Sequence, residues 1–406
     1  MRKQISFIHA ADLHLDSPFK GLINAPDNVF REIRESTFQA LDHLIDAAIE
    51  RKVDFVLIVG DLFDNEKQSL KAQIRLRKAF ERLQQYKINV YLSYGNHDFI
   101  NGNIHPVTYS ENVFIFPNEK VSQFTFESGG QKMAQIYGFS YENRAVVERK
   151  VEEYNISSEA IPFHIAMLHG SILSNTEHDV YAPFQLNDMG KKDFDYWALG
   201  HIHKREILRQ SPPIVYPGNI QGRNRKETDE KGCYHVILDE QGSELSFIPL
   251  QAIQFKALTI DVSACEQIHE LEKHILKTLI DTDYPQLLDV TLKSDQIRLK
   301  EWENEKRIED VIELVNESIV VKQNWSFIFR VSVDVNQQIS DEEAAKGNHF
   351  IGELTRHFEK VSIHSYTKEL FQHKQARKYL NRLSDEEEME IKEEAKQLLI
   401  NELLKG

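Results

Sequence analysis

The sequence predicts an α/β fold in which short buried strands alternate with longer amphipathic helices. Five short runs of β-branched and apolar residues have the pattern of buried strands. They lie at 5–10, 54–59, 89–94, 163–168 and 196–199. Between them, 29–51 and 69–85 place apolar residues at steps of three and four, as amphipathic helices do. The alternation of the two element types predicts layers of helices packed on sheets.

Composition predicts a large intracellular protein with more than one folding unit. The chain has 406 residues and 41% hydrophobic content, and single hydrophobic cores stop growing near about 250–300 residues. Its two cysteines, Cys233 and Cys265, exclude a disulfide framework and a thiolate metal site, and they suit the cytoplasm. No apolar run reaches about 18 residues, so we expect no membrane segment. The net charge of −15 argues against a generally basic surface for nucleic acid, but it is compatible with a local basic patch.

Each of the five predicted strands ends in a polar motif. The motifs read HAADLHLD, LIVGDLFD, YLSYGNHD, AMLHGS and ALGHIHK. The loops that leave strand ends in an α/β fold converge on one rim, which is the usual place for a ligand site. Seven side chains from distant positions could therefore meet there. They are Asp12, His14, Asp61, Asn96, His169, His201 and His203.

These seven side chains predict a centre of two metal ions. Carboxylate, amide and imidazole groups without thiolate suit divalent ions, and the oxygen-rich set favours Mn²⁺, with Fe²⁺, Zn²⁺ and Mg²⁺ as alternatives. Seven ligands exceed what one ion with an open position needs, whereas two ions that share a bridging carboxylate accommodate them. Such a pair can neutralise an anionic substrate and lower the pKa of a bound water.

Each motif also has a purely structural interpretation. A Gly-Asp pair after a strand is commonly a turn whose aspartate caps the next helix. The HIH triplet puts two imidazoles on one face of a strand without any metal, and GNHD is ordinary turn chemistry. The occurrence of all five motifs in order, each at a strand end, favours the metal centre.

The ordered set DLH, GDLFD, GNHD, LHG and GHIH resembles the calcineurin-like metallophosphoesterases. The passages LGHIHKREIL, PPIVYPGNIQGRN and DEKGCYHVIL are similar to the DNA-repair exonuclease branch of that family, the SbcD-like proteins, and within it to the YhaO-type proteins. The resemblance covers roughly 1–250 and implies a metallophosphoesterase β-sandwich flanked by helices. It further implies a metal-dependent phosphodiesterase that acts on DNA ends as an exonuclease.

The resemblance also implies a role for each residue. One ion would be held by Asp12, His14, Asp61 and His203, and the other by Asp61, Asn96, His169 and His201. Water activated by the two ions would attack phosphorus, and His97 would donate a proton to the leaving group. Asp64 stands where archaeal members of the branch often carry His and where the phosphatases carry Asp. We interpret it as the residue that orients His97.

Two other functions are compatible with the same motifs. The first is a phosphatase or nucleotide phosphoesterase that uses the same dimetal centre on a smaller substrate. The second is a non-catalytic scaffold on the same fold. All seven predicted ligands and His97 are present, which argues against the scaffold.

The chain after about residue 250 predicts two further regions. Residues 251–340 read as β-α-β-α-β, a small α/β unit, and the resemblance implies a cap that helps to grip DNA. Residues 341–406 predict a helical appendage in which Ser384 and Glu387 form a capping box before an apolar stripe. The resemblance implies that this segment docks on an SbcC-like coiled-coil ATPase and that the chain can form a homodimer. Packing of the stripe on its own domain is the alternative.

A basic segment, GRNRK at 222–226, follows the last metal motif. Such segments are most often solvated loops. Because this one lies close to the predicted site, we expect Arg223, Arg225 and Lys226 to contact the phosphate backbone of DNA.

Overall fold

The computed structural model of the chain describes residues 3–19, 22, 25–64, 68–102, 107–173, 181–279 and 282–335. In the C-terminal segment it describes residues 362, 363, 366, 367, 388, 389, 391, 392 and 395. Most of the predicted appendage at 341–406, including its capping box, therefore lies outside the described residues. Among the residues that are described, no helix is both long enough and apolar enough to cross a membrane.

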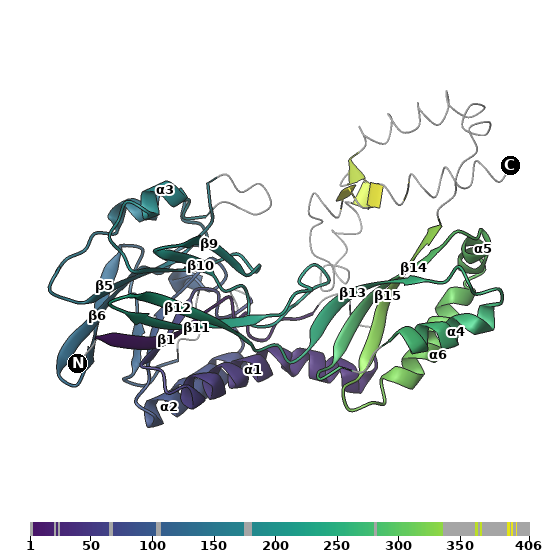
Figure 1. The fold of residues 1–406 in the computed structure, drawn as a ribbon, viewed down its shortest axis with the longest axis horizontal. Helices are drawn as coiled ribbons and strands as arrows, with labels where there is room; N and C mark the ends of the chain where they lie inside the picture. The colour runs from purple at the N-terminus through teal and green to yellow at the C-terminus, as the bar shows by residue number, and fades with distance from the viewer. Residues whose placement is uncertain are drawn as a thin grey trace.

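The main body is a sandwich of two six-stranded mixed sheets (Figure 1). The first sheet has the order β12-β11-β1-β2-β3-β4, and the second has the order β5-β6-β7-β8-β10-β9. The first sheet contains β1 (Gln4–Ala11), β2 (Phe55–Val59), β3 (Asn89–Ser93), β4 (Val113–Ile115), β11 (Gly232–Asp239) and β12 (Gly242–Pro249). The second contains β5 (Ser122–Ser128), β6 (Gln131–Gly138), β7 (Phe163–His169), β8 (Tyr196–Gly200), β9 (Glu206–Gln210) and β10 (Pro213–Tyr216). The five strands that end in polar motifs, β1 to β3 and β7 to β8, form the parallel centres of these sheets.

Buried apolar side chains from both sheets fill the space between them. Phe7 stacks on Phe55 with ring centroids 5.1 Å apart, and Tyr196 of the second sheet meets Phe7 edge-on at 5.3 Å. Ile165 and Met167 of β7 belong to the same fully buried cluster. This core holds the carboxyl ends of β1, β2, β7 and β8 close together, and those ends carry the motifs.

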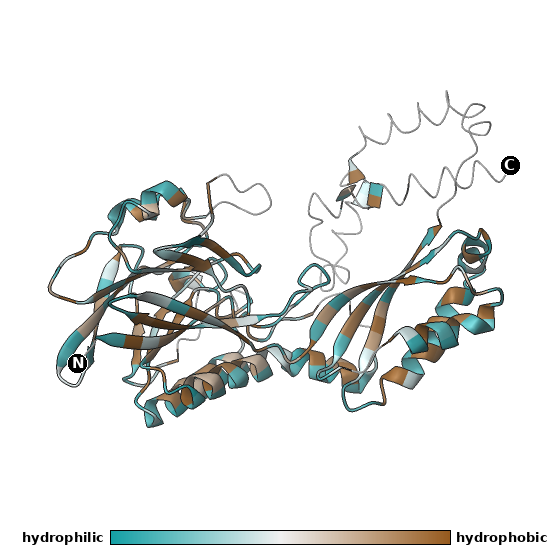
Figure 2. Ribbon diagram, in the orientation of Figure 1, coloured by the Kyte–Doolittle hydropathy of each residue, from teal (hydrophilic) through white to brown (hydrophobic). Residues whose placement is uncertain are grey.

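Helices cover the outer face of the first sheet. Helix α1 (Asp27–Glu50) and helix α2 (Leu70–Gln85) bury their apolar faces against it and leave polar residues outside (Figure 2). Ser69 caps α2, because its side chain accepts a hydrogen bond from the Ala72 backbone N–H at 3.1 Å. The second sheet is covered by α3 (Leu186–Met189), the 3-10 turn Lys150–Glu153 and the loops beside them. A further 3-10 turn, Ile100–Gly102, follows the GNHD motif.

A second, smaller unit follows β12. Its three parallel strands are β13 (Gln254–Asp261), β14 (Gln286–Ser294) and β15 (Ser326–Val335), in that order. Helices α4 (Ile268–Thr278), α5 (Arg298–Asn304) and α6 (Arg307–Ile319) pack on one face of the sheet. The order of strands and long helices is the one that the sequence pattern predicts, and the short helix α5 is an addition to it. We call β13 to β15 with α4 to α6 the cap unit.

Helix α1 belongs to both units. Its first turns lie under the cap unit and its remaining turns under the main body (Figure 1). Val29 and Ile33 pack in one cluster with Phe255 of β13 and with Trp325, which precedes β15. The Trp325 indole N–H also donates a hydrogen bond to the Glu32 carboxylate at 2.7 Å. The two units therefore meet through a packed apolar junction as well as through the chain between β12 and β13.

Candidate metal centre

The seven predicted ligands all follow the carboxyl ends of central strands. Asp12 and His14 follow β1, Asp61 follows β2, and Asn96 follows β3, all in the first sheet. His169 ends β7, while His201 and His203 follow β8 in the second sheet. Because the two sheets face one another, the single rim that the sequence predicts is built by strand ends from both.

The backbone at these strand ends takes a conformation that L-residues rarely adopt. Asp12, His14 and Asp61 have φ of 53°, 42° and 52°, in the left-handed region, and His201 has φ of 95°. Such residues cost about 1–3 kcal/mol each and persist where the surrounding structure holds them, commonly at functional sites. These turns lie where the ligand atoms from the strand ends of both sheets come together.

Gly95 allows the loop after β3 to approach the other strand ends closely. A Cβ atom at this position would lie 2.3 Å from Asp61 Oδ1 and 2.8 Å from His169 Nε2. Real Cβ atoms do not approach other atoms so closely. The glycine of the GNHD motif is thus required by the proximity of two predicted ligands.

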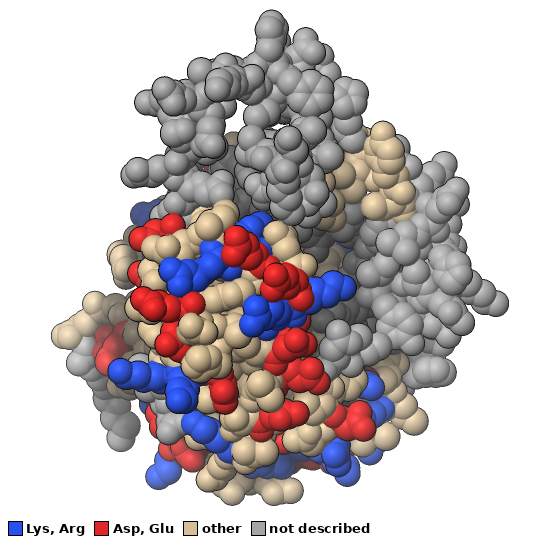
Figure 3. Space-filling model, turned by 90° about the vertical axis from the view of Figure 1, so that its right-hand side faces the viewer, with Lys and Arg blue, Asp and Glu red and all other residues tan. Residues whose placement is uncertain are grey.

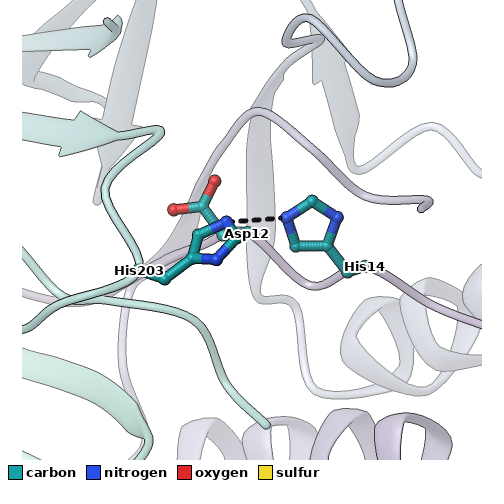
Figure 4. Close-up of side chains that lie close together, drawn as sticks. All are labelled: Asp12, His14 and His203. Atoms are coloured by element: carbon teal, nitrogen blue, oxygen red, sulfur yellow. Dashed lines mark hydrogen bonds between the residues drawn. The ribbon is translucent and has the colours of Figure 1, made fainter. Parts of the chain in front are cut away.

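Asp12, His14 and His203 form the first ligand group (Figure 4). Their candidate ligand atoms all lie within 4.8 Å of one another, and Nε2 of His14 is 3.0 Å from Nε2 of His203. Ligand nitrogens lie about 2.1 Å from an ion such as Zn²⁺, so two of them at about a right angle are separated by about 3 Å. The spacing of the two imidazoles therefore fits a shared divalent ion.

Asp61, His169 and His201 form the second ligand group, and Asn96 joins it. The amide oxygen Oδ1 of Asn96 lies 3.0 Å from His169 Nε2 and 3.1 Å from His201 Nδ1. Three donor atoms of different side chains thus converge on one point. Oxygen and imidazole nitrogen without sulfur are the donors that Mn²⁺, Fe²⁺ and Zn²⁺ accept.

Asp61 lies between the two groups. Its Oδ2 atom is 3.4 Å from His169 Nε2 in the second group and 3.8 Å from His14 Nε2 in the first. Its Oδ1 atom accepts a hydrogen bond from the His97 backbone N–H at 3.0 Å. A carboxylate in this position is suited to bridge two ions.

The buried charges of the site suit a bound cation. Burial raises the pKa of the Asp12 carboxyl to about 6. Burial by itself would lower the pKa of His169, but the negative charges of Asp61 and Asp12 outweigh it and raise the value to about 9. Burial would raise the pKa of Asp61, yet His169 holds it well below its usual range. Without metal, a proton on His169 balances Asp61, and a bound divalent cation would take over that balancing charge.

His97 stands beside the ligand groups and is more accessible than its neighbours. Its ring is 5.1 Å from the ring of His14, and it is partly exposed whereas Asn96 and Asp98 are buried. The Nδ1 atom of His97 lies 3.0 Å from the backbone carbonyl oxygen of Asp64. Because a carbonyl only accepts hydrogen bonds, Nδ1 carries a hydrogen in this contact.

The interpretation of Asp64 needs correction. The contact that orients His97 is made by the main chain of Asp64, not by the carboxylate. The Asp64 carboxylate forms an ion pair with the guanidinium group of Arg223, and one of its oxygens is 3.7 Å from His14 Nδ1. The sequence motif locates the residue correctly but does not distinguish its carbonyl from its side chain.

The basic segment at 222–226 lies between the metal centre and the cap unit. Arg223, whose side chain is only 14% exposed, pairs with Asp64, and its Nη2 atom is 3.4 Å from His203 Nδ1. Nη1 of Arg225 lies 3.9 Å from the carboxylate of Asp289 on β14. Lys226 is exposed, and its backbone N–H donates to Asn224 at 2.9 Å. Arg223 and Arg225, two of the predicted phosphate contacts, thus pair with carboxylates of the protein itself.

Two buried carboxylates near the site were missed by sequence reasoning. Asp98 accepts hydrogen bonds from the backbone N–H groups of Gly95 at 2.7 Å and Leu62 at 2.6 Å, which ties the loops after β2 and β3 together. Burial raises the pKa of Asp98 to about 7. Glu227 contacts Nδ1 of His203 at 2.9 Å. The final aspartate of GNHD was a visible signal for Asp98, whereas the sequence around Glu227 offers none.

Comparison with known proteins places this arrangement in a family. The family model described as calcineurin-like phosphoesterase matches residues 5–205. The uncharacterized metallophosphoesterase YhaO of Bacillus subtilis is 36% identical over 410 residues, which cover 99% of this chain and 99% of YhaO. The chain is a calcineurin-like metallophosphoesterase.

More distant relatives of this metallophosphoesterase carry the name DNA double-strand break repair protein Mre11. The protein of Methanocaldococcus jannaschii is 28% identical over 264 residues, 62% of this chain and 66% of that protein. The protein of Saccharolobus solfataricus is 22% identical over 362 residues, 83% of this chain and 84% of that protein. The metallophosphoesterase is thus a hydrolase of a family that binds two divalent metal ions, and its two ligand groups fit them.

Proposed function

We propose that this metallophosphoesterase cleaves phosphodiester bonds at DNA ends, with Mn²⁺ as the metal. The observation that carries the proposal is the pair of ligand groups on either side of Asp61, with the partly exposed His97 fixed beside them. DNA as the substrate draws support from the relatives named for double-strand break repair, which match well beyond the metal motifs.

The side chains have separate roles in the proposed reaction. Asp12, His14 and His203 would hold one ion, His169, His201 and Asn96 the other, and Asp61 both. When bound, the two ions neutralise the phosphodiester and lower the pKa of the attacking water. The other roles fall to the protein: buried strand ends fix the ligands, and the backbone contact of Asp64 fixes His97.

His97 would supply the proton that the leaving oxygen needs. Its Nδ1–H is engaged with the carbonyl oxygen of Asp64, so Nε2 is the atom through which it can act on a substrate. In the imidazolium form, Nε2 donates a proton to the departing oxygen, which breaks away from phosphorus as an alcohol rather than as an alkoxide.

The surface limits where DNA could bind. On the end of the cap unit shown in Figure 3, the described lysines and arginines are interspersed with aspartates and glutamates. The basic segment at 222–226 lies instead beside the metal centre. We therefore expect phosphate contacts near the site itself, where bound metal ions add positive charge, rather than on that end of the cap unit.

A direct assay tests the proposal. Purified protein is incubated with end-labelled duplex and single-stranded DNA, with and without Mn²⁺, and in parallel with mononucleotides. Shortening of labelled DNA only with Mn²⁺ supports a DNA-end phosphodiesterase. Rapid hydrolysis of mononucleotides with intact DNA would favour the small-substrate phosphoesterase, and no hydrolysis of either substrate would favour a scaffold.

Two substitutions assign the roles within the site. Asp61→Asn should lose bound metal and activity together, because the bridging position serves both ions. His97→Asn should keep both metals and lose about 10²–10⁴-fold in cleavage rate, the usual effect of a missing general acid. Calorimetric titration with Mn²⁺ measures the first property and a phosphodiester assay the second. Equal metal loss in the two variants would contradict these roles.

We also propose a cytoplasmic location and an SbcC-like coiled-coil ATPase as partner. Cys233 and Cys265 are both free and buried, which suits a reducing compartment. The partner would bind the apolar stripe of the C-terminal segment as a helix in a groove. In the sequence pattern this stripe consists of Ile391, Ala395, Leu398, Leu399 and Leu403. Leu399→Glu with Leu403→Glu should abolish pull-down by the ATPase and leave hydrolysis of a small phosphodiester intact. Retained pull-down would refute this docking. The possible homodimer is a separate question, which the mass of the free protein in solution answers.

A further inference from the structure

Glu227 is a buried carboxylate that accepts hydrogen bonds on both oxygens. Oε2 accepts from the Asn219 side-chain amide at 2.7 Å and from the Arg223 backbone N–H at 2.8 Å. Oε1 accepts from the Asn224 side-chain amide at 3.1 Å and lies 2.9 Å from His203 Nδ1. A carboxylate offers about four acceptor positions, so these partners use them all.

The geometry assigns the hydrogen on the His203 ring. Three of the four partners of Glu227 are amide N–H groups that can only donate, which is the environment of an ionised carboxylate. Such a carboxylate can only accept from His203, so the hydrogen lies on Nδ1. The lone pair is then on Nε2, the atom that points toward Asp12 and His14 in the first ligand group (Figure 4).

A neighbouring contact suggests the opposite assignment. Nη2 of Arg223 lies 3.4 Å from the same Nδ1 atom, and a guanidinium group can only donate. If that contact were the hydrogen bond, Nδ1 would be bare and Nε2 would carry the hydrogen. The carboxylate contact is 2.9 Å, at ordinary hydrogen-bond length, whereas 3.4 Å lies beyond it. The shorter, charge-assisted contact decides the assignment.

We propose that Glu227 is a positioning residue for the first metal ion. It holds His203 in the tautomer whose Nε2 can bind the ion and fixes the direction of the ring, and it increases the basicity of that ligand. Carboxylates that accept from the far nitrogen of a metal-binding imidazole act in this way in other proteins. The inference rests on the dimetal centre of the proposed function, but it assigns a residue to which neither the motifs nor the comparisons point.

A simpler role for Glu227 is to anchor its loop. The three amide contacts close the segment 219–227 on itself, and a carboxylate would do this whether or not His203 bound a metal. The two roles differ in what they predict. An anchor affects the whole site, whereas a positioning residue acts through His203 and therefore on one ion.

The tautomer of His203 is the first test, and it uses the metal-free wild-type protein. Long-range ¹H–¹⁵N correlation spectra of protein labelled at histidine distinguish Nδ1–H from Nε2–H, and His203→Asn identifies the signal. We expect the His203 ring to carry its hydrogen on Nδ1 and none on Nε2. A ring protonated on Nε2 alone would overturn the proposal. This measurement needs neither activity nor a folded Glu227 variant.

The second test is a double-mutant cycle read by calorimetric titration with Mn²⁺. Glu227→Gln should weaken one of two binding events about 10–100-fold and leave the other unchanged. The same substitution should have no further effect in a His203→Asn background, because the residue acts through that ring. Glu230→Gln, an equal charge change at an exposed position of the same loop, is the control. Equal weakening of both ions, or an undiminished effect without His203, would show a general anchor.

The outcomes separate this inference from the proposed function. Wild-type protein that binds two Mn²⁺ ions and cleaves no DNA would refute the proposed substrate and leave the role of Glu227 intact. Conversely, active protein in which Glu227→Gln weakens neither ion would refute the positioning role alone.

Discussion

At the scale of single residues, the main chain matters as much as the side chains. Asp64 contacts His97 through its carbonyl oxygen, and any residue at that position has a carbonyl. The side chain can therefore change without removing the contact that holds the imidazole. As an aspartate, its side chain adds an ion pair with Arg223, and one carboxylate oxygen lies 3.7 Å from His14 Nδ1.

Asp64→Ala should accordingly be far milder than a substitution of His97. Loss of a general acid costs about 10²–10⁴-fold in rate, and we expect Asp64→Ala to lose at least tenfold less than that, because the Nδ1 contact remains. The kcat of both variants on one phosphodiester, under saturating Mn²⁺, measures the difference. Equal losses in the two variants would show that the carboxylate itself is needed for proton transfer.

His9 gives the metal-free protein a defined response to acid. The ring is buried, with Nε2 3.0 Å from the Leu199 carbonyl oxygen and Nδ1 3.0 Å from the Tyr196 hydroxyl. Burial lowers its pKa from 6.5 to about 3. Because the folded pKa is the lower one, the stabilisation is complete above pH 6.5 and is lost as pH falls from there toward about 3.

This response can be isolated by substitution. Below pH 6.5, each further unit of decrease in pH lowers the free energy of unfolding by about 1.4 kcal/mol through His9. At about pH 5 the total reduction should therefore be about 2 kcal/mol. His9→Gln keeps a polar group at the position but cannot titrate. Denaturant unfolding of both proteins between about pH 8 and pH 5 should show a steeper loss for wild type. Parallel curves would mean that His9 does not carry the effect.

At the scale of the elements, the strand ends are built for close approach. The loop after β3 reaches Asp61 and His169 only because residue 95 has no side chain. Gly95→Ala should displace those two ligands and weaken Mn²⁺ binding by at least tenfold, as loss of ligand alignment commonly does. Mn²⁺ titration is the measurement.

Gly130→Asn is the matched control for that substitution. Gly130 lies in the turn between β5 and β6 with positive φ, where asparagine is tolerated, and a Cβ atom there would meet nothing within 4 Å. It should bind Mn²⁺ as wild type does. If both glycine variants bound metal normally, the crowding at residue 95 would be relieved without moving the ligands.

The same elements show what the sequence can predict. Motifs such as GDLFD indicate their ligand residues because a buried strand and its polar end are adjacent in the chain. The partnership of Glu227 with His203 spans 24 residues and depends on how one loop closes, which no local pattern records. The edge strands β9 and β12 and the short helix α5 lack fully buried runs and give only a weak pattern. Strands β6 and β10 were missed as well, although both contain buried runs.

At the scale of the whole molecule, the junction under α1 couples the two units. Trp325 is 3% exposed and packs with Val29 and Ile33 of the helix. The amphipathic pattern of α1 predicts a helix with one buried face, but it does not say that this face is shared between two sheets. That division becomes visible only in the folded chain.

Trp325→Ala should loosen the cap unit without touching the metal centre. Removal of a buried tryptophan typically costs about 3–5 kcal/mol, and here it also removes the hydrogen bond to Glu32. We expect scanning calorimetry to show the cap unit melting before the main body, while hydrolysis of a small phosphodiester below the first transition stays normal. A single transition with an unchanged midpoint would contradict the coupling.

The path of α1 also bears on how the molecule can be divided. A cut between β12 and β13 falls at a natural break in the chain, but it would leave the first turns of a 24-residue helix projecting with Val29 and Ile33 bare. A catalytic fragment made that way would expose the apolar face of these first turns. Aggregation through that face could be mistaken for instability of the sandwich. Recombination that exchanged the cap unit alone would meet the same obstacle. Because helix α1 packs on both units, the two units have to be kept together when the chain is divided or recombined.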